Sequence, residues 1–305
     1  MARQVLAGVG ARAAAGDGPA AQTLALMKRF LWKRFHGLPD ASLVKLAAAF
    51  ERWVLAGRSD GRVLYALRRF HRECYLRHVG GGGAQARERA RARTRAADIR
   101  DVLRAAGAPG GHFPGSPTPT ASLDVGCAEG SLTAAIGRAL GLPAQAAVGC
   151  DVAPAPAPPP VGFTYWRGRA EALPFEDGQF QVVSCIMSLH HFADLDQALS
   201  EIRRVLAPGG LVLVREHDCP DAHFAVFLDF VHCFYAAVEG EVTLRGEQAD
   251  ADFDAARGQV VSGRYRSLAE WDAVLRRAGF EPAGQPAHTR DIFRSFYRVY
   301  RPNRR

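Results

Sequence analysis

The sequence lacks the features that mark several classes of protein. Its six cysteines include no Cys-x-x-Cys pair, which argues against a zinc or disulfide framework and indicates reduced thiols. No apolar run reaches the length of a membrane span, because the candidate at 24–35 contains four basic residues. The hydrophobic share of 48% and the charged share of 23% are ordinary for a globular protein. We therefore expect an intracellular, cytoplasmic protein with no metal site and no membrane span.

Lysine is scarce, and the basic charge is unevenly placed. Only three of the 39 basic residues are lysines. Residues 1–112 contain 21 basic and 8 acidic residues, whereas residues 113–305 contain 18 and 23. Such an excess predicts a polyanionic partner, namely RNA contacted through residues 24–104. The arginine bias leaves a second interpretation open, a solvated basic surface without a partner.

The first 83 residues are predicted to precede the main domain. Residues 1–18 are rich in alanine and glycine and carry two arginines before the first acid. This predicts a disordered N-terminus at 1–19, with an organelle-targeting signal as the alternative. Apolar residues then recur at helical spacing, so 20–83 is predicted to be a basic helical extension.

A second basic helix and a linker are expected between this extension and the first strand. The helix is predicted at 87–104, and its apolar face, which includes Ile99 and Leu103, is expected to lie on the main domain. Three prolines in 112–120 predict a linker.

The rest of the chain is organised around 122–133. Residues 123–125 read as the end of a buried strand, and Gly126, Ala128 and Gly130 then form a tight turn into a helix. A strand, a small-residue turn and a helix N-terminus let backbone approach a ligand closely. Asp151 ends the next apolar run, at the distance where an acid holds ribose hydroxyls in nucleoside-binding folds.

From Ser122 onward, strand and helix patterns alternate. Apolar runs at 163–166, 180–187 and 211–214 predict strands, and the stretch 195–206 predicts an amphipathic helix between two of them. This order predicts an α/β domain at 84–305, with a mostly parallel sheet covered by helices on both faces. A Pro/Ala run at 153–160 is expected to be a surface insertion.

Four segments in this order resemble class I S-adenosylmethionine-dependent methyltransferases of the type 11 group. They are Leu-Asp-Val-Gly-Cys-Ala-Glu-Gly at 123–130, Gly-Arg-Ala-Glu-Ala-Leu-Pro-Phe at 168–175, Ser-Leu-His-His-Phe at 188–192 and Arg-Val-Leu-Ala-Pro-Gly-Gly at 204–210. The resemblance covers about 98–300. It implies a Rossmann-like methyltransferase fold with a seven-stranded, mostly parallel sheet and S-adenosyl-L-methionine as cofactor.

The resemblance also implies a set of cofactor-binding residues. Asp124 is expected near the ammonium group of the cofactor and Asp151 at the ribose hydroxyls. A backbone N–H of Ala170 is expected at the adenine edge. The implied set is completed by Gly126, Ala128, Gly130, Glu171, Cys185 and Leu189.

Three positions depart from the family pattern. Ala128 replaces the middle glycine of the loop, and Gln181 replaces a common acid. Arg169 replaces the acid that meets the adenine amino group, and arginine cannot accept a hydrogen bond. Glu171 or a backbone carbonyl would have to substitute for that acid.

The catalytic candidates follow two neighbouring strands. His190 comes after the fourth strand, and Glu216 and His217 follow the fifth, so all three are expected at one sheet edge. His217 is a candidate general base, with Glu216 or Asp218 beside it. For His190, closing the cofactor pocket by packing is the alternative to proton transfer.

The methyl acceptor is left open between a small molecule and RNA. A small molecule would lie under a lid made by the aromatic segment 224–235, whereas RNA would follow the arginine-rich N-terminal third. A third interpretation is a catalytically degenerate methyltransferase-fold subunit that binds RNA or protein in a larger assembly. Arg169 and the helical extension favour that interpretation.

Overall fold

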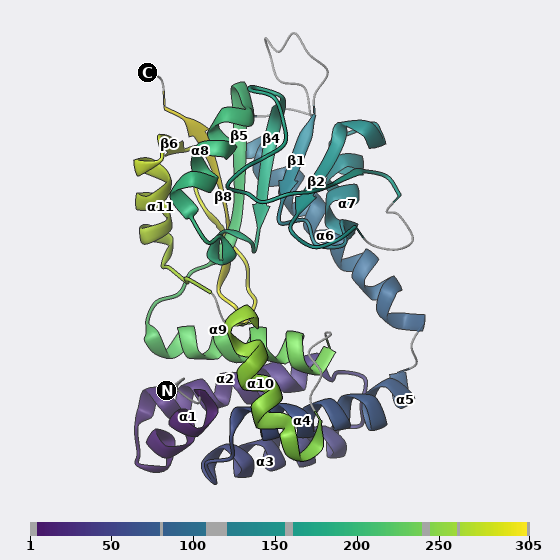
Figure 1. The fold of residues 1–305 in the computed structure, drawn as a ribbon, viewed down its shortest axis with the longest axis vertical. Coiled ribbons are helices and arrows are strands. Elements are labelled where there is room, and N and C mark those ends of the chain that lie inside the picture. Colours follow the sequence, from purple (N-terminus) through teal and green to yellow (C-terminus); the bar gives the residue numbers. More distant parts are fainter. Residues whose placement is uncertain are drawn as a thin grey trace. The chain divides into compact units, whose positions relative to one another are not determined.

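A computed structural model of the chain divides into two compact units (Figure 1). One unit contains Met1–Ala84 and Cys219–Gly263, and the other contains Gln85–Asp218 and Arg264–Arg305. The structure describes residues 5–79, 82–107, 121–155, 161–239, 245–260 and 263–303. The predicted linker at 112–120 and most of the predicted insertion, 156–160, lie outside these ranges.

The first unit is helical, as expected for the N-terminal third, but it also takes a later segment that the sequence assigned to the main domain. Its N-terminal helices are α1 (Val5–Ala14), α2 (Gly18–Arg34), α3 (Asp40–Leu55), α4 (Asp60–Phe70), the π-helical η1 (His71–Tyr75) and α5 (Leu76–Val79). The later segment adds α9 (Ala222–Phe234), the π-helical η5 (Tyr235–Glu239), the 3-10 turn η6 (Gly246–Gln248) and α10 (Ala249–Val260).

The prediction of a disordered N-terminus is wrong for residues 5–14, which form α1. Leu6 and Val9 are buried, and the amide of Leu6 donates to Asp60 at 2.8 Å. A Cβ at Gly10 would lie 1.9 Å from the carbonyl oxygen of Val54, so the glycine lets α1 approach α3 closely. Residues 1–4 lie outside the described ranges.

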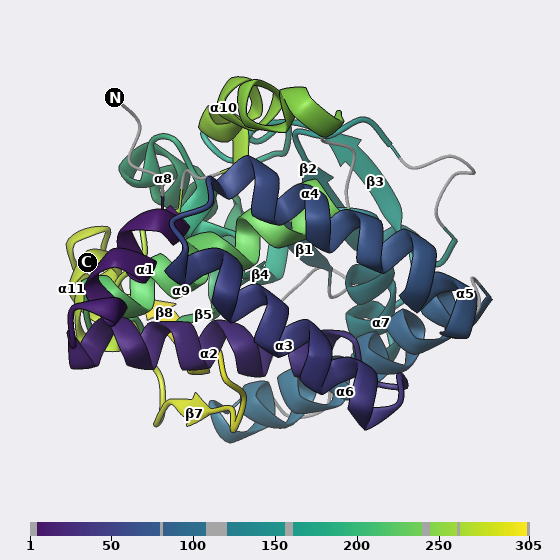
Figure 2. The ribbon, with the colours of Figure 1, turned by 90° about the horizontal axis from the view of Figure 1, so that it is seen from below.

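The aromatic segment predicted as an acceptor lid supplies the core of this unit. Helix α9 lies against α1 and α2 (Figure 2). Phe230 and Phe234 are buried and contact Phe30 edge-on, with ring centroids 5.9 and 5.1 Å away. Thr23 also donates to the carbonyl of His223 at 3.3 Å. These rings are therefore occupied in packing helices together.

One helix among the described residues, Ala222–Glu239, has the length and apolar composition of a membrane span, which the sequence analysis did not anticipate. Its mean hydropathy is 1.3 over 18 residues, and half of the window is buried inside the structure. The packing of α9 against α2 is that of a core helix in a folded unit.

The second unit is an α/β domain. Its strands are β1 (Ser122–Val125), β2 (Ala147–Asp151), β3 (Thr164–Arg167), β4 (Phe180–Ile186), β5 (Leu206–His217), β6 (Phe280–Pro282), β7 (Ala287–His288) and β8 (Ser295–Pro302). Its helices are α6 (Gly82–Ala105), α7 (Ser131–Ala139), α8 (Leu195–Val205) and α11 (Leu268–Arg277), with 3-10 turns η3 (Ala144–Ala146) and η4 (Leu189–His191).

Within the described residues, the strands form one sheet in the order β3-β2-β1-β4-β5-β8-β6, and the short β7 pairs with β8. The pairs from β3 to β5 are parallel, and β8 runs antiparallel to β5 and β6. This confirms the mostly parallel sheet, with one two-residue strand beyond the seven expected. The order reverses beside β1, which places a topological switch point between β1 and β4.

Helices cover both faces of the sheet, as predicted (Figure 1). Alternate residues of β5 separate the two cores: Val212 packs with α8 and α11, whereas Leu211 and Leu213 pack with α6 and α7. Ile99 and Leu103 lie in the second core, which confirms the predicted apolar face of the basic helix.

Candidate active site

The loop after β1 contains three left-handed residues within five positions. The φ angles are 81° at Gly126, 46° at Ala128 and 77° at Gly130, which is the N-cap of α7. The amide of Gly126 donates to the carbonyl of Cys150 at 2.8 Å, which ties the loop to the end of β2. A left-handed conformation strains alanine by about 1–2 kcal/mol. The rest of the loop therefore holds Ala128 in a conformation that favours glycine.

The loops after β1 and β4 touch each other at the switch point. A Cβ at Gly126 would lie 2.5 Å from the Cβ of Ser188, so the position requires glycine. Ser188 Oγ donates to the carbonyl of Val125 at 2.8 Å. Open α/β sheets bind ligands at this crevice, outside the carboxyl ends of the strands.

Asp151 stands at the carboxyl end of β2 and faces the same loop. Its Oδ2 accepts from the amide of Ala128 at 2.8 Å, and its Oδ1 accepts from the amide of Ala153 at 3.0 Å. Each carboxylate oxygen has capacity for a second hydrogen bond. Asp151 can therefore accept two ligand hydroxyls while it stays oriented by backbone.

Asp124 is a buried carboxylate held by two hydroxyls. Thr133 Oγ1 donates to Oδ2 at 2.7 Å and Ser184 Oγ donates to Oδ1 at 2.8 Å. Burial raises the pKa of Asp124, and the hydroxyl bonds offset the shift only in part. A cationic ligand group beside this carboxylate would stabilise its ionised form.

Gly130 has a structural reason to be glycine that the sequence analysis missed. A Cβ there would lie 1.7 Å from Cζ of Phe163, whose ring packs with Ala134 and Ala147. The close neighbour of Gly130 is thus the protein's own aromatic ring, so the absent side chain does not by itself indicate a ligand.

The segment after β3 forms a turn in which Ala170 is buried. The amide of Ala172 donates to the carbonyl of Arg169 at 3.1 Å, and Ala170 is buried in the turn. Ala170 shares a core with Leu173, Cys185 and Leu189. The structure thus brings three of the residues named from the sequence, Ala170, Cys185 and Leu189, into one apolar cluster.

Glu171 and Arg169 make other contacts. Glu171 Oε1 accepts from the amides of Ala193 and Asp194 at 3.1 and 3.2 Å, and its Oε2 lies 3.4 Å from Arg169 Nε. The side chain of Arg169 is 63% exposed. Glu171 therefore fixes the loop before α8, and a role for it at adenine stays a prediction.

His190 and Glu216 form a buried pair. The Nδ1 of His190 lies 2.7 Å from Glu216 Oε2, and the backbone amide of His190 donates to Glu216 Oε1 at 3.3 Å. Burial opposes ionisation of Glu216, but His190 and then His217 hold its pKa below the usual value. Because the Glu216 carboxylate accepts a hydrogen bond from Nδ1–H, neutral His190 carries its lone pair at Nε2.

His217 lies near this pair, and its tautomer is set in the same way. Its Nδ1 donates to the carbonyl of Phe293 at 3.0 Å, and its ring centroid is 5.5 Å from that of His190. Asp218 faces elsewhere, because it accepts from the amide of Leu268 and the guanidinium of Arg294. The two histidines thus lie close together, as the neighbouring strand ends predicted. Asp218 instead holds Leu268 and Arg294 in place.

Sequence reasoning missed Tyr265, whose ring centroid lies 5.5 Å from that of His190 and 6.0 Å from that of His217. The amide of the neighbouring Arg264 donates to the carbonyl of His190 at 2.9 Å. The only signal was an aromatic residue just before the Ser267 cap of α11.

The departure at Gln181 has a structural explanation. Its side-chain oxygen accepts from the amide of Ala121 at 2.6 Å, so the buried side chain of Gln181 fixes the backbone that enters β1.

A cavity of about 610 Å³ lies elsewhere, beside the first residues of β2 and β3. It is lined by Gln145, Val148, Thr164, Trp166, Leu173, Pro174, Phe175, Glu176 and Gln179, and it contains none of the candidate site residues.

Part of the chain is similar to known proteins. Residues 123–214 match the type 11 family, described as "Methyltransferase domain". The "Probable methyltransferase ltbC" of Aspergillus luteorubrus is 31% identical over 187 residues, which are 54% of this chain and 59% of that protein.

Two further similar proteins are a shorter match and a more distant one. The "Ubiquinone/menaquinone biosynthesis C-methyltransferase UbiE" of Hahella chejuensis is 50% identical over 54 residues, 18% of this chain and 22% of that protein. The match to this and two other bacterial relatives spans only 22–23% of those proteins' length. The solved structure of the trans-methyltransferase CalH, a complex with SAH, is 17% identical, covers 92% of this chain and 89% of its own, and has a TM-score of 0.49.

Proposed function

We propose that this chain is a class I S-adenosylmethionine-dependent methyltransferase, which transfers a methyl group from that cofactor to an acceptor bound beside His190. One observation carries the proposal. Two carboxylates, a left-handed turn and a His–Glu pair all stand at the carboxyl edge of β1, β2, β4 and β5. That edge includes the switch point at which open α/β sheets bind ligands.

The residues present fit the cofactor. Asp151 would accept the two ribose hydroxyls, and Asp124 would lie near the ammonium group, where its buried charge needs a cation. The backbone N–H of Ala170 would donate to the adenine edge. Since Arg169 points to solvent and Glu171 binds backbone amides, a carbonyl would accept from the adenine amino group. When bound, the cofactor supplies an electrophilic methyl group on a sulfonium.

His190 is the preferred general base. Glu216 holds its Nδ1, so that Nε2 presents the lone pair that takes a proton from an acceptor O–H, N–H or C–H group. His217 has the same tautomer and is the second candidate. The ionised Glu216 would stabilise the imidazolium formed at His190. Orientation of the acceptor lone pair along the methyl–sulfur bond would supply much of the rate.

A small molecule with an acidic proton suits this site best. The enclosure of His190 by His217 and Tyr265 is the kind of aromatic, partly polar setting that binds small ligands. The similar proteins include a ubiquinone/menaquinone biosynthesis C-methyltransferase, which agrees with such an acceptor. Mass spectrometry of metabolites and nucleosides from cells without the protein would identify the acceptor class.

Cofactor binding is the first test. Calorimetry with S-adenosylmethionine should give a sub-millimolar dissociation constant for the full chain. Asp151→Ala should weaken it roughly ten- to a hundred-fold, from the loss of hydrogen bonds worth about 1.5–3 kcal/mol. Asp101→Ala, at a side chain on α6 that is 63% exposed, is the matched control and should bind like wild type. Absence of binding by the wild type would favour the degenerate assembly subunit.

The RNA alternative rests on the exposed arginines of α6. Arg91 and Arg93 are exposed, and Arg95 is half-buried, whereas the side chains of Arg87 and Arg89 lie outside the described residues. If this helix tracks phosphates, RNA binding should fall with salt at a log–log slope of about −0.7 per phosphate. Filter binding at two salt concentrations tests this, with all five arginines changed to Gln. Negligible binding of wild type at low salt would leave the basic third as a solvated surface.

A further inference from the structure

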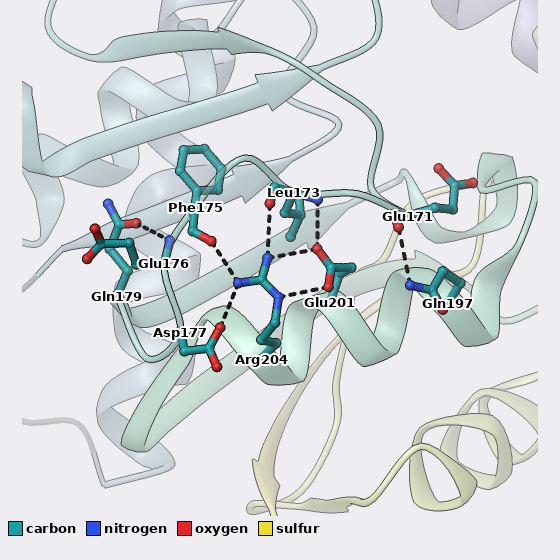
Figure 3. Close-up of polar contacts among 9 residues, drawn as sticks. All are labelled: Glu171, Leu173, Phe175, Glu176, Asp177, Gln179, Gln197, Glu201 and Arg204. Atoms are coloured by element: carbon teal, nitrogen blue, oxygen red, sulfur yellow. Dashed lines mark hydrogen bonds and ion pairs between the residues drawn. The ribbon is translucent and has the colours of Figure 1, made fainter.

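The loop that follows the Ala170 turn is fastened to α8 by a single guanidinium (Figure 3). Arg204 Nη1 donates to the carbonyl of Phe175 at 2.7 Å and to Asp177 at 2.8 Å. Its Nη2 donates to the carbonyl of Leu173 at 3.0 Å and to Glu201 at 2.8 Å, and its Nε donates to the other oxygen of Glu201 at 2.8 Å. An arginine has five N–H groups, and each of these has a partner here.

The rest of the same helix face extends the attachment. Gln197, Glu201 and Arg204 recur at helical spacing on α8 and all face the loop (Figure 3). Glu201 accepts from the amide of Leu173 at 2.9 Å, and Gln197 donates to the carbonyl of Glu171 at 3.4 Å. The backbone carbonyl of Arg204 also accepts from the amide of Gly178 at 2.8 Å. The loop is thus tied to the helix by backbone groups from 171 to 178.

This attachment lies next to the proposed adenine contact. The turn 169–172 immediately precedes Leu173. The hydrogen bonds from Arg204 and Glu201 to the Leu173 backbone, here called the clamp, therefore fix where the turn ends. Its other end is fixed to β2, because the amide of Gly168 donates to the carbonyl of Asp151 at 2.9 Å. With both ends held, the N–H of Ala170 keeps one direction relative to Asp151. A preorganised donor binds a base more tightly than one that must be ordered on binding.

We propose that Arg204 is a positioning residue for the cofactor, which acts by holding the 173–177 backbone so that Ala170 presents its N–H to the adenine ring. The inference rests on the proposed function, since it concerns the same cofactor site. Arg204 begins the Arg-Val-Leu-Ala-Pro-Gly-Gly segment at 204–210. Its proposed role in base recognition is indirect, because it binds the 173–177 backbone and not the cofactor.

Lysine cannot replace arginine in this role. A guanidinium presents five donors in a fixed plane, which lets it bind the Glu201 carboxylate in a bidentate manner and still reach two carbonyls. An ammonium group has three donors on one atom. The preceding residue provides a matched control. Arg203 donates to the carbonyl of Gly279 and, at 3.2 Å, to Asn303, far from the loop.

The test measures base recognition in the full chain. Calorimetry would compare S-adenosylhomocysteine with its inosine counterpart, whose N1 carries a hydrogen and so cannot accept from Ala170. Wild type should prefer adenine by about tenfold or more. Arg204→Ala should weaken S-adenosylhomocysteine binding about tenfold and bring the adenine-to-inosine ratio close to one. Arg204→Lys should behave like the alanine variant, and Arg203→Ala should keep the wild-type ratio.

The outcomes separate the inference from the proposed function. If wild type does not bind S-adenosylhomocysteine, the proposed function fails and the inference fails with it. If wild type binds and Arg204→Ala keeps both the affinity and the base ratio, only the inference is overturned. A loss of affinity with an unchanged base ratio would also overturn it, because that is the result of general destabilisation. Should Arg204→Ala fail to fold, Glu201→Gln, which weakens the same clamp without changing its shape, is expected to lower the ratio.

Discussion

Asp124→Asn should stabilise the protein while it weakens cofactor binding. The carboxylate is buried and accepts hydrogen bonds from Thr133 and Ser184, which are neutral hydroxyls. An amide of the same shape can keep both contacts, since a hydroxyl either donates or accepts. The substitution removes a buried charge, whose desolvation is costly in the absence of a cation. It also removes the charge proposed to bind the ammonium group.

The size and pH dependence of the effect follow from the raised pKa of Asp124. Each unit by which the folded pKa exceeds the unfolded value costs about 1.4 kcal/mol of stability once the group is ionised. An unfolded aspartate titrates near about pH 4. Wild type should therefore have its full stability below that pH and lose part of it as the pH rises through the raised folded pKa. The variant should match wild type in acid and exceed it at neutral pH.

The assay is urea unfolding without ligand between pH 3 and 8, followed by calorimetry with S-adenosylmethionine. Binding should weaken about ten- to a hundred-fold, from a charge-assisted hydrogen bond worth about 1.5–3 kcal/mol. Asp272→Asn is the control, because Asp272 is paired with Arg298 at 3.0 Å, and it should destabilise the protein. If Asp124→Asn also destabilises at neutral pH, or binds the cofactor as wild type does, the reasoning about this carboxylate is refuted.

Two further predictions concern the neighbouring loop and the His–Glu pair. Gly130→Val should lower stability by about 2–4 kcal/mol with or without cofactor, because its Cβ meets the ring of Phe163 at a left-handed position. Thermal melts would measure this, and Phe163→Ala in the same chain should restore part of the loss; no restoration would contradict the proposed clash. Glu216→Gln should reduce turnover about a hundredfold with an unchanged cofactor KM, if His190 is the base that Glu216 orients. Steady-state kinetics with the identified acceptor decide this, and unchanged turnover would leave His190 a packing residue.

The sequence predicted the parts of the site that follow from strand ends. One apolar run stops at Gly126 and the next ends at Asp151, which located the strands β1 and β2 and the loops after them. Because parallel strands end on the same side, both loops had to lie at one edge of the sheet. The same rule brought His190 to Glu216, from neighbouring strands β4 and β5. These predictions needed only local pattern and the geometry of a parallel sheet.

Contacts made across long stretches of chain were not predictable in this way. Tyr265 reaches His190 from a segment 75 residues later, after the chain has passed through the helical unit. Helix α1 reads as an Ala/Gly-rich tail, and only its packing and the hydrogen bond to Asp60 order it. Likewise, the partners of Arg204 depend on how the 173–177 loop folds onto α8, which no periodicity encodes.

The discontinuous helical unit has a consequence for how this protein can be made. Helix α2 completes its core with α9, so a growing chain must expose the faces around Phe30 until some two hundred residues more have left the ribosome. Contacts of such long sequence separation form slowly, because a long loop must close first. The Arg34–Glu239 ion pair closes late for the same reason. A fragment that begins after residue 84 would leave α9 without its partners. The two helical segments, 1–84 and 219–263, should bind each other in solution when they are expressed separately and mixed.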